Sequence, residues 1–261
     1  AAPAADALVV ESTSAGKRHD PTPPAEALRD EIRRAVETGG ALVMPSFAIG
    51  RTQEILFTIR ALEESKEIPS LPVFVDSPMA VDATPIFLAH REDHDPEMAR
   101  LLAEGREPLR PAKLAFARSP EQSKAINDVR GPCIILSASG MATGGRILHH
   151  LARRLPDPAT TVLLVGFQAA GTRGHSLQQG AATLRIHGED VPVKARVATI
   201  AGFSAHADES EIDRWLATFP SPPRRTFLVH GEPPALAAAK ERMDRLGWPA
   251  SIPRHLEEMK L

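Results

Sequence analysis

Short apolar runs alternate with amphipathic stretches along most of the chain. The apolar runs, in chain order, are residues 41–44, 73–76, 113–116, 133–137, 161–165, 196–200 and 226–229. The amphipathic stretches cover residues 24–38, 52–65, 79–89, 96–103, 120–127, 145–155, 209–219 and 234–246. Continuous apolar runs are typical of strands buried on both faces of a parallel sheet. The alternation predicts an α/β protein with mainly parallel sheets, plus a hairpin joining residues 183–186 to 191–195 near Gly188.

The composition restricts the class of protein but does not identify a ligand. The 261 residues carry a formal charge of −2, so local arginines, and not a broad positive field, would have to hold an anionic substrate. The single cysteine, Cys133, lies inside an apolar run, which predicts a buried thiol, no disulfide framework and a reducing, cytoplasmic location. No run approaches the ~20 apolar residues of a membrane span, so no membrane partner is expected.

Two histidines stand out because each follows a strand-like run. His206 comes soon after the run 196–200, and His230 directly follows the run 226–229, with an amphipathic helix between them. The parallel strands of a strand–helix–strand unit end at one edge of a sheet. We therefore predict that both imidazoles lie at one edge, where they suit metal ligation and proton transfer. Glu11, which follows a further apolar run at residues 7–10, is a third candidate.

A structural role is the alternative for each of these side chains. A lone histidine is more often a surface or core residue than a site residue. Asp208 and Glu211 have the spacing of a capping box, so this acid pair can serve the helix N-terminus alone, where the helix field disfavours a cation at His206. His149 and His150 are adjacent on a predicted helix and face different directions, so they are not expected to share a metal.

Three strand-to-helix loops combine small residues with an arginine, at residues 45–52, 137–146 and 166–175. Small residues let backbone N–H groups approach an anion, a helix N-terminus adds a favourable dipole, and arginine adds a bidentate donor. The alternative is that such loops only turn tightly. The phosphate-binding residues predicted from these loops, together with one serine before His206, are Ser46, Gly50, Arg51, Ser137, Ser139, Gly140, Gly144, Gly145, Arg146, Thr172, Arg173 and Ser204. We expect the three arginines to face one groove.

Six segments resemble the β-CASP branch of the metallo-β-lactamase superfamily, the RNA-processing nucleases. In chain order they are EST from Glu11, PSFAIGR from Pro45, SASGM from Ser137, GFQAAGT from Gly166, FSAHAD from Phe203 and VHGE from Val229. The resemblance implies an αββα sandwich interrupted by an inserted α/β domain. Residues 1–15 would end the N-terminal part of the sandwich, residues 16–191 form the β-CASP domain, and residues 192–261 form the C-terminal part.

The resemblance also implies a chemistry. Glu11, His206 and His230 match the family's motif A acid, motif B histidine and motif C histidine, and a histidine at motif C favours RNA over DNA. In the family, two zinc ions hold a hydroxide that attacks phosphorus, the motif C histidine ligates zinc, and the motif B histidine protonates the leaving oxygen. The resemblance therefore implies a zinc-dependent RNA nuclease in RNA processing or decay. We expect Glu11 and His206 to lie about 2.6–3.2 Å apart or one water away.

Two departures from the family pattern qualify this picture. The Tyr-Gly that usually follows Glu-Ser-Thr is replaced by Ser14 and Ala15. The family's His-x-His-x-Asp-His signature precedes motif A, but only ten residues precede Glu11, so we expect a C-terminal fragment that is inactive by itself and keeps one zinc ligand, His230. The alternative from another class is a non-catalytic RNA-binding or scaffold homologue, which the upstream sequence would decide. The sequence is compatible with a homo-oligomer and does not define the oligomeric state.

Overall fold

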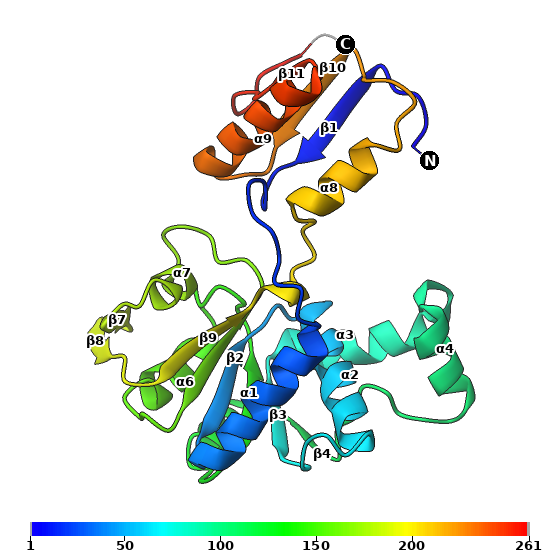
Figure 1. Cartoon of the computed structure of the whole chain (residues 1–261). Helices are drawn as coiled ribbons and strands as arrows, with labels where there is room; N and C mark the ends of the chain where they lie inside the picture. Colours follow the sequence, from blue (N-terminus) through cyan, green and yellow to red (C-terminus); the bar gives the residue numbers. More distant parts are fainter. Residues whose placement is uncertain (1, 260–261) are drawn as a thin grey trace. The chain divides into compact units, whose positions relative to one another are not determined.

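Two units make up the chain in the computed structural model, which describes residues 2–259 (Figure 1). The central unit is Thr22–Phe203, and the terminal unit combines Ala1–Pro21 with Ser204–Leu261. These limits lie at 21/22 and 203/204, and the predicted domain boundaries at 15/16 and 191/192 stay a prediction. Near the second boundary, strand β9 (Arg196–Ile200) pairs with β6 and so belongs to the central sheet. The outermost residues of the predicted flanks, 1 and 260–261, lie outside the described residues.

The central unit is built on a six-stranded parallel sheet with the strand order β4-β3-β5-β2-β6-β9. The strands not yet given are β2 (Ala41–Pro45), β3 (Pro72–Asp76), β4 (Lys113–Phe116), β5 (Cys133–Ser137) and β6 (Thr161–Val165). Three of the four inner strands, β2, β5 and β6, are buried at every position, as their continuous apolar sequences require. Burial in β5 raises the pKa of the Cys133 thiol, the predicted buried cysteine.

Helices cover both faces of this sheet (Figure 1). They are α1 (Pro24–Thr38), α2 (Arg51–Glu64), α3 (Pro78–Ala89), α4 (Pro96–Ala103), α5 (Pro120–Ile126), α6 (Ile147–Arg154) and α7 (Arg173–Gln178), with a short 3-10 helix at Arg91–Asp93. Leu42 and Met44 of β2 pack with α1 and α2, whereas Ala41 and Val43 pack with α6 on the opposite face. This period of two is the geometry of a strand between two helical layers.

The terminal unit contains a smaller parallel sheet, β1-β10-β11, with two helices. Its elements are β1 (Ala7–Glu11), α8 (Glu209–Leu216), β10 (Arg225–Val229), α9 (Pro233–Leu246) and β11 (Ala250–Ser251). Leu8 and Leu228 share an apolar cluster with Leu216 of α8 and Met243 of α9, so both helices pack on one face of the sheet. Strand β1 lies alongside β10, so the segment before Glu11 and the segment before His230 share one sheet.

The elements predicted from the apolar pattern are all present, and most ends agree within one or two residues. The exceptions are short or local. Helix α7 and strand β11 have too few residues to give a periodic signal, and the hairpin strands β7 (Thr183–Ile186) and β8 (Glu189–Pro192) turn at His187 and Gly188. These two residues have positive φ of 49° and 86°, as a tight two-residue hairpin turn requires. Within residues 2–259, the helices are too short or too polar to cross a membrane.

Candidate active site

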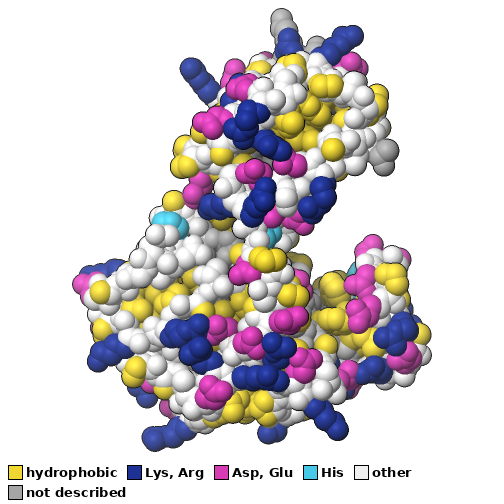
Figure 2. Space-filling model, in the orientation of Figure 1, with side chains coloured by type: hydrophobic (Ala, Val, Ile, Leu, Met, Phe, Trp, Pro, Cys, Tyr) yellow, Lys and Arg dark blue, Asp and Glu magenta, His cyan; other side chains and the backbone are white. Residues whose placement is uncertain are grey.

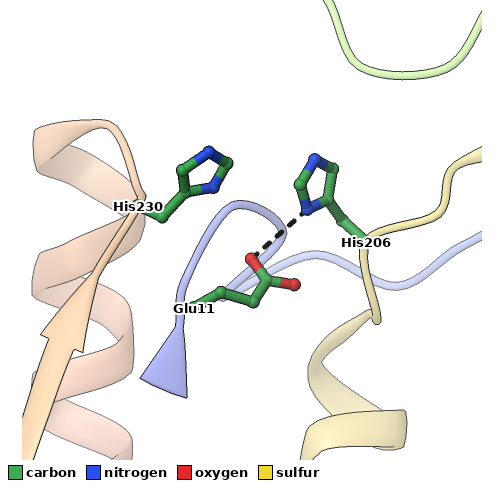
Figure 3. Close-up of side chains that lie close together, drawn as sticks. All are labelled: Glu11, His206 and His230. Atoms are coloured by element: carbon green, nitrogen blue, oxygen red, sulfur yellow. Dashed lines mark ion pairs between the residues drawn. The ribbon is translucent and has the colours of Figure 1, made fainter. Parts of the chain in front are cut away.

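Three side chains of the terminal unit, Glu11, His206 and His230, lie close together (Figure 3). Glu11 is the last residue of β1, His230 directly follows β10, and His206 lies between a 3-10 helix (Ala201–Phe203) and α8. The two imidazole rings are 5.3 Å apart between centroids. One ligand atom from each of the three residues lies within 4.8 Å of the others. The structure therefore brings together the three site residues that the sequence predicted.

The route by which they meet differs from the prediction. We expected the strands before His206 and His230 to be neighbours in one sheet, but β9 and β10 belong to different sheets. A strand–helix–strand sequence fixes only chain order, and β9 pairs with β6 instead. The pairing of β1 with β10, with Glu11 opposite Val229, sets Glu11 beside the strand end that carries His230.

Asp208 fixes the segment that carries His206. It forms a β-bridge with Ser14, and its carboxylate accepts hydrogen bonds from the amides of His19 (2.9 Å) and Glu211 (2.9 Å) and from the hydroxyl of Ser210 (2.7 Å). Burial opposes ionisation, but these hydrogen bonds outweigh it and lower the pKa of Asp208 to about 2. The capping box with Glu211 is present, so this acid pair is structural, as the alternative interpretation had it.

Thr13 orients the imidazole of His230. Its hydroxyl donates to the carbonyl oxygen of His230 at 2.8 Å and lies 3.0 Å from Nδ1 of the same residue. A hydroxyl has one proton, and the carbonyl takes it, so the threonine oxygen accepts from Nδ1–H. The other ring nitrogen, Nε2, is then left with its lone pair. This tautomer is the one that binds a metal through Nε2 while a second residue holds the ring.

The backbone at His230 is also specialised. His230 has φ of 54°, a left-handed conformation that costs energy in a residue with a side chain. Gly231 follows, and a Cβ there would lie 2.9 Å from the carbonyl oxygen of Ser12 and 3.1 Å from its Cβ. Glycine at this position lets the turn after β10 approach the segment after β1. The strained turn therefore sets His230 beside Glu11 and Thr13.

Glu11 and His206 form a half-exposed pair. His206 Nδ1 lies 3.5 Å from Glu11 Oε2, and the two side chains are 35% and 32% exposed. The distance exceeds the about 2.6–3.2 Å expected for a direct contact, and the expected alternative of one intervening water stays a prediction. The same carboxylate oxygen accepts a hydrogen bond of 2.8 Å from the amide of Thr13. Glu11 is thus held by the backbone and attracts a protonated His206. An accessible imidazole beside a fixed carboxylate can hold a proton and release it to a bound molecule.

The residues present fit a zinc ion, although alone they do not complete a two-metal site. His230 is exposed, and Nε2 is the nitrogen that the Thr13 contact leaves open. Imidazole nitrogen and carboxylate oxygen are zinc ligands, and the cluster has the spacing to share an ion. Two zinc ions need more than these donors, because each ion takes about four ligands.

Arg146 has internal partners that the sequence did not predict. Its guanidinium donates to the carboxylate of Asp76 at 2.7 Å and to the carbonyl oxygens of Ala117 and Arg118 at 3.0 Å each. These bonds tie the loop before α6 to the ends of β3 and β4. The structure therefore gives Arg146 a structural role, and its contact with an RNA phosphate stays a prediction.

The other two predicted arginines are engaged as well. Arg51 pairs with Glu54 and lies over the ring of Phe203, 5.5 Å from the ring centre. Burial lowers the pKa of Arg51. Arg173 donates to the carbonyl oxygen of Arg185 at 2.7 Å. A phosphate would have to share these guanidinium groups with their present partners, and the common groove stays a prediction.

Two of the predicted phosphate-binding serines have buried hydroxyls. Ser137 donates to the carbonyl oxygen of Asp76 at 2.7 Å, and Ser46 donates to that of Met44 at 3.3 Å. Both residues are almost inaccessible. Their hydroxyls stabilise the ends of β2 and β5, and the amide of Ser46 donates to the carbonyl oxygen of Ser137 at 3.0 Å. A contact of either residue with an RNA phosphate stays a prediction.

The remaining predicted residues mostly organise their own loops. Ser139 Oγ accepts backbone hydrogen bonds within its loop, Ser204 Oγ accepts from the amide of His206 at 3.2 Å, and Thr172 caps α7. Among the glycines, Gly50 and Gly145 have positive φ of 80° and 81° and so act as turn residues. Gly144 has open space beside its Cα, whereas Gly140 underlies the ring of Phe47. These positions are compatible with backbone contacts to an anion and do not test them.

Sequence reasoning missed a second histidine–carboxylate pair, Asp76 and His150, in the central unit. Asp76 Oδ2 lies 2.7 Å from His150 Nε2, and both side chains are fully buried. One signal was available, because His150 falls on the apolar face of α6 with Ile147 and Leu151. His149 instead stacks on His187, with ring centroids 4.5 Å apart. The prediction that the adjacent histidines do not share a metal agrees with these different surroundings.

Comparisons with known proteins match the two parts of the chain separately. Residues 52–177 match the β-CASP domain, and residues 190–253 match the Zn-dependent metallo-hydrolase RNA specificity domain. The second match begins near the predicted boundary at 192 and includes β9, although β9 lies in the central sheet.

Curated relatives give the same family. A ribonuclease of Thermus thermophilus is 35% identical over 255 residues, which cover 97% of this chain and 57% of the relative. An RNase J-like protein of Methanocaldococcus jannaschii is 32% identical over 231 residues, covering 87% and 52%. Transcription termination factor FttA of Thermococcus kodakarensis is 32% identical over 272 residues, covering 99% and 41%. The chain spans about half the length of the curated relatives it matches. Both family matches, these relatives and the ordered motifs show that the chain belongs to the β-CASP branch of the metallo-β-lactamase superfamily.

Proposed function

We propose that the protein containing this chain hydrolyses RNA phosphodiester bonds in a zinc-dependent reaction. The observation that carries the proposal is the cluster of Glu11, His206 and His230, in which an open imidazole nitrogen and a carboxylate-paired imidazole lie side by side. RNA as the substrate is supported by the match to an RNA specificity domain and by relatives named as ribonucleases.

We propose His230 as a ligand of one of two zinc ions, through Nε2. Thr13 supports this role because it holds Nδ1 and fixes the ring. When bound, zinc supplies the positive charge that activates water and neutralises the phosphodiester. The remaining ligands would come from residues outside this chain, since a single histidine cannot hold two ions.

His206 carries the proton in this proposal. Glu11 accepts from the Thr13 amide and so keeps its Oε2 atom in place beside Nδ1 of His206. The carboxylate holds one side of the ring, and the exposed side can deliver a proton to the oxygen that leaves phosphorus. Glu11 is then a positioning residue, and His206 is the group that touches the reacting atoms.

The test is cleavage of a labelled RNA by the complete protein, with zinc content measured on the same samples. His206→Ala and His230→Ala should both strongly reduce cleavage, and only His230→Ala should reduce bound zinc. His255→Ala is the matched control, because His255 is exposed and belongs to none of the candidate metal clusters found among the described residues. RNA binding without cleavage by the zinc-loaded wild type would overturn the nuclease and favour the non-catalytic scaffold.

A further inference from the structure

An aromatic ring stands open to solvent at the carboxyl edge of the central sheet. Phe47 lies in the loop between β2 and α2 and is 50% exposed, and Ile49 in the same loop is 67% exposed. The carboxyl ends of parallel strands are where α/β sheets bind ligands. Lys and Arg side chains are interspersed with Asp and Glu on the face seen in Figure 2, so shape and stacking matter here more than a broad positive field.

This loop is rigid although its apolar side chains are exposed. The amide of Ser46 donates to the carbonyl oxygen of Ser137 at 3.0 Å. The carbonyl oxygen of Phe47 accepts from the hydroxyl of Thr52 at 2.7 Å, and that of Ala48 accepts from the buried side chain of Gln53 at 3.2 Å. Several fixed contacts therefore hold the loop so that Phe47 points away from the core. An exposed ring on a fixed backbone loses little conformational entropy when a ligand stacks on it.

One side of the Phe47 ring rests on Gly140. A Cβ at Gly140 would lie 2.9 Å from Cδ2 and 3.0 Å from Cε2 of the ring, so only glycine leaves room for it. Gly140 belongs to the SASGM segment, and Phe47 belongs to PSFAIGR. The two loops therefore form one feature, in which the Phe47 ring packs on the backbone of Gly140.

Hydrogen-bond donors without an internal acceptor surround the ring. Within residues 2–259, the amides of Phe47, Ala48, Ile49 and Gly50 donate to no other group, and neither does that of Gly140. Backbone N–H groups of this kind need water or a ligand, and in a turn that opens a helix they favour an anion. A nucleotide offers both complements, a planar base for the ring and a phosphate for the amides.

We propose that Phe47 is a stacking platform for one unpaired nucleobase of the bound RNA. The inference rests on the proposed function, which it deepens by naming a residue that contacts the substrate. A base can stack on a protein ring only when it has left its own helix, so duplex RNA cannot use the platform. Every base has a π face, so the preference is for single strands and not for one sequence.

The test measures binding of a labelled single-stranded RNA and of its duplex to the complete protein in a His206→Ala background, which prevents cleavage. Phe47→Ala should weaken single-strand binding about 5- to 100-fold and leave duplex binding unchanged. Phe47→Trp should retain binding. Phe87→Ala is the matched control, because Phe87 is 39% exposed on α3 and contacts His94.

A spectroscopic readout separates stacking from a packing role. In Phe47→Trp, emission of the new indole should be quenched when single-stranded RNA is added, whereas Phe87→Trp should not respond. Equal loss of single-strand and duplex binding in Phe47→Ala, or no loss, would overturn the platform while leaving the nuclease intact. Failure of the parent His206→Ala protein to bind either RNA would instead overturn the proposed function.

Discussion

The two units each hold a histidine–carboxylate pair, and the pairs differ in how fully their hydrogen-bonding capacity is used. In the central unit, His150 Nε2 lies 2.7 Å from Asp76 Oδ2, and neither side chain is exposed. In the terminal unit, His206 Nδ1 lies 3.5 Å from Glu11 Oε2, and about a third of each side chain is exposed. Each pair consists of an imidazole and a carboxylate. One pair is buried and the other is partly exposed, so we expect them to have different roles.

The Asp76–His150 pair is saturated by its neighbours. Asp76 also accepts from Arg146 at 2.7 Å and from Ser123 at 2.5 Å, while the other ring nitrogen of His150 contacts the amide oxygen of Asn127 at 3.0 Å. Burial raises the pKa of Asp76, but hydrogen bonds from His150, Ser123 and Arg146 outweigh it, and the pKa lies below its ordinary value. No capacity is left for a substrate, so the network joins β3, α5 and α6.

The Glu11–His206 pair retains hydrogen-bonding groups that are accessible to solvent. One carboxylate oxygen of Glu11 is anchored by the Thr13 amide, and the imidazole of His206 reaches solvent. Groups that react must exchange partners during the reaction, and a saturated, buried group cannot do so without breaking the fold. A perturbed and buried ion pair is therefore a weak indicator of catalysis in this chain, and an incompletely satisfied pair beside a third ligand is a stronger one.

The largest expected effect is on catalysis, from loss of His206. His206→Ala in the complete protein should reduce turnover ~10²–10⁴-fold, because a proton donor is removed. Zinc content and the thermal midpoint of unfolding should stay at wild-type values, since His206 is half-exposed and, in our assignment, not a ligand. Single-turnover cleavage and metal analysis measure both quantities. Loss of zinc in this variant would make His206 a ligand and refute the assignment.

The next effect is on folding, from the buried pair. Asp76→Ala should lower the free energy of unfolding by ~3–5 kcal/mol, because it leaves Arg146 and His150 without their buried partner. Glu11→Ala should cost less than about 1 kcal/mol, since its pair is exposed to solvent. Urea unfolding followed by far-ultraviolet circular dichroism compares the two. Similar losses in both variants would remove the distinction between the pairs.

A smaller effect should fall on zinc affinity when Thr13 is changed. Thr13→Val keeps the shape but removes the oxygen that accepts from Nδ1 of His230, so zinc affinity should fall about 10- to 100-fold. Thr13→Ser retains the hydroxyl and is the control. Competition with a chromophoric chelator gives the affinity. An unchanged affinity in Thr13→Val would mean that the ring is oriented by the strained backbone at His230 alone.

The sequence was sufficient for elements whose signal is local or repeated. The continuous apolar runs predicted β2, β5 and β6 as buried parallel strands, and every residue in these three strands is buried. Glu11, His206 and His230 were selected as candidates from the strand-like runs that they follow, and the resemblance gave each its expected role, since spacing alone left a structural role open. The capping box at Asp208 was readable because its two members are three residues apart.

Contacts between distant segments were not readable. Asp76 and His150 are 74 positions apart, and Thr13 and His230 are 217 apart, so nothing in either local pattern marks them as partners. For the same reason, the sequence did not show that β9 pairs with β6, because strand pairing depends on the whole sheet. Arg146 and Arg173 were read as free donors for the same reason, because their internal acceptors lie on other elements. The partner of Arg51, Glu54, is instead three residues away on the same helix.

The smallest expected effect is a pH dependence that separates a capping carboxylate from the catalytic pair. Asp208 has a pKa of about 2 in the folded chain against an ordinary value of 3.8, so the unfolded chain takes up a proton more readily than the folded chain. The stability from this group is present above about pH 4 and is lost as the pH falls from ~4 to ~2. Asp208→Asn keeps a capping oxygen but cannot titrate, and it should reduce this acid sensitivity of the terminal unit. The two tryptophans of the chain, Trp215 and Trp248, both lie in that unit and contact Phe219, so their emission reports its unfolding without interference from the central unit. An unchanged acid transition in Asp208→Asn would show that the hydrogen bonds to Asp208 do not depend on its charge.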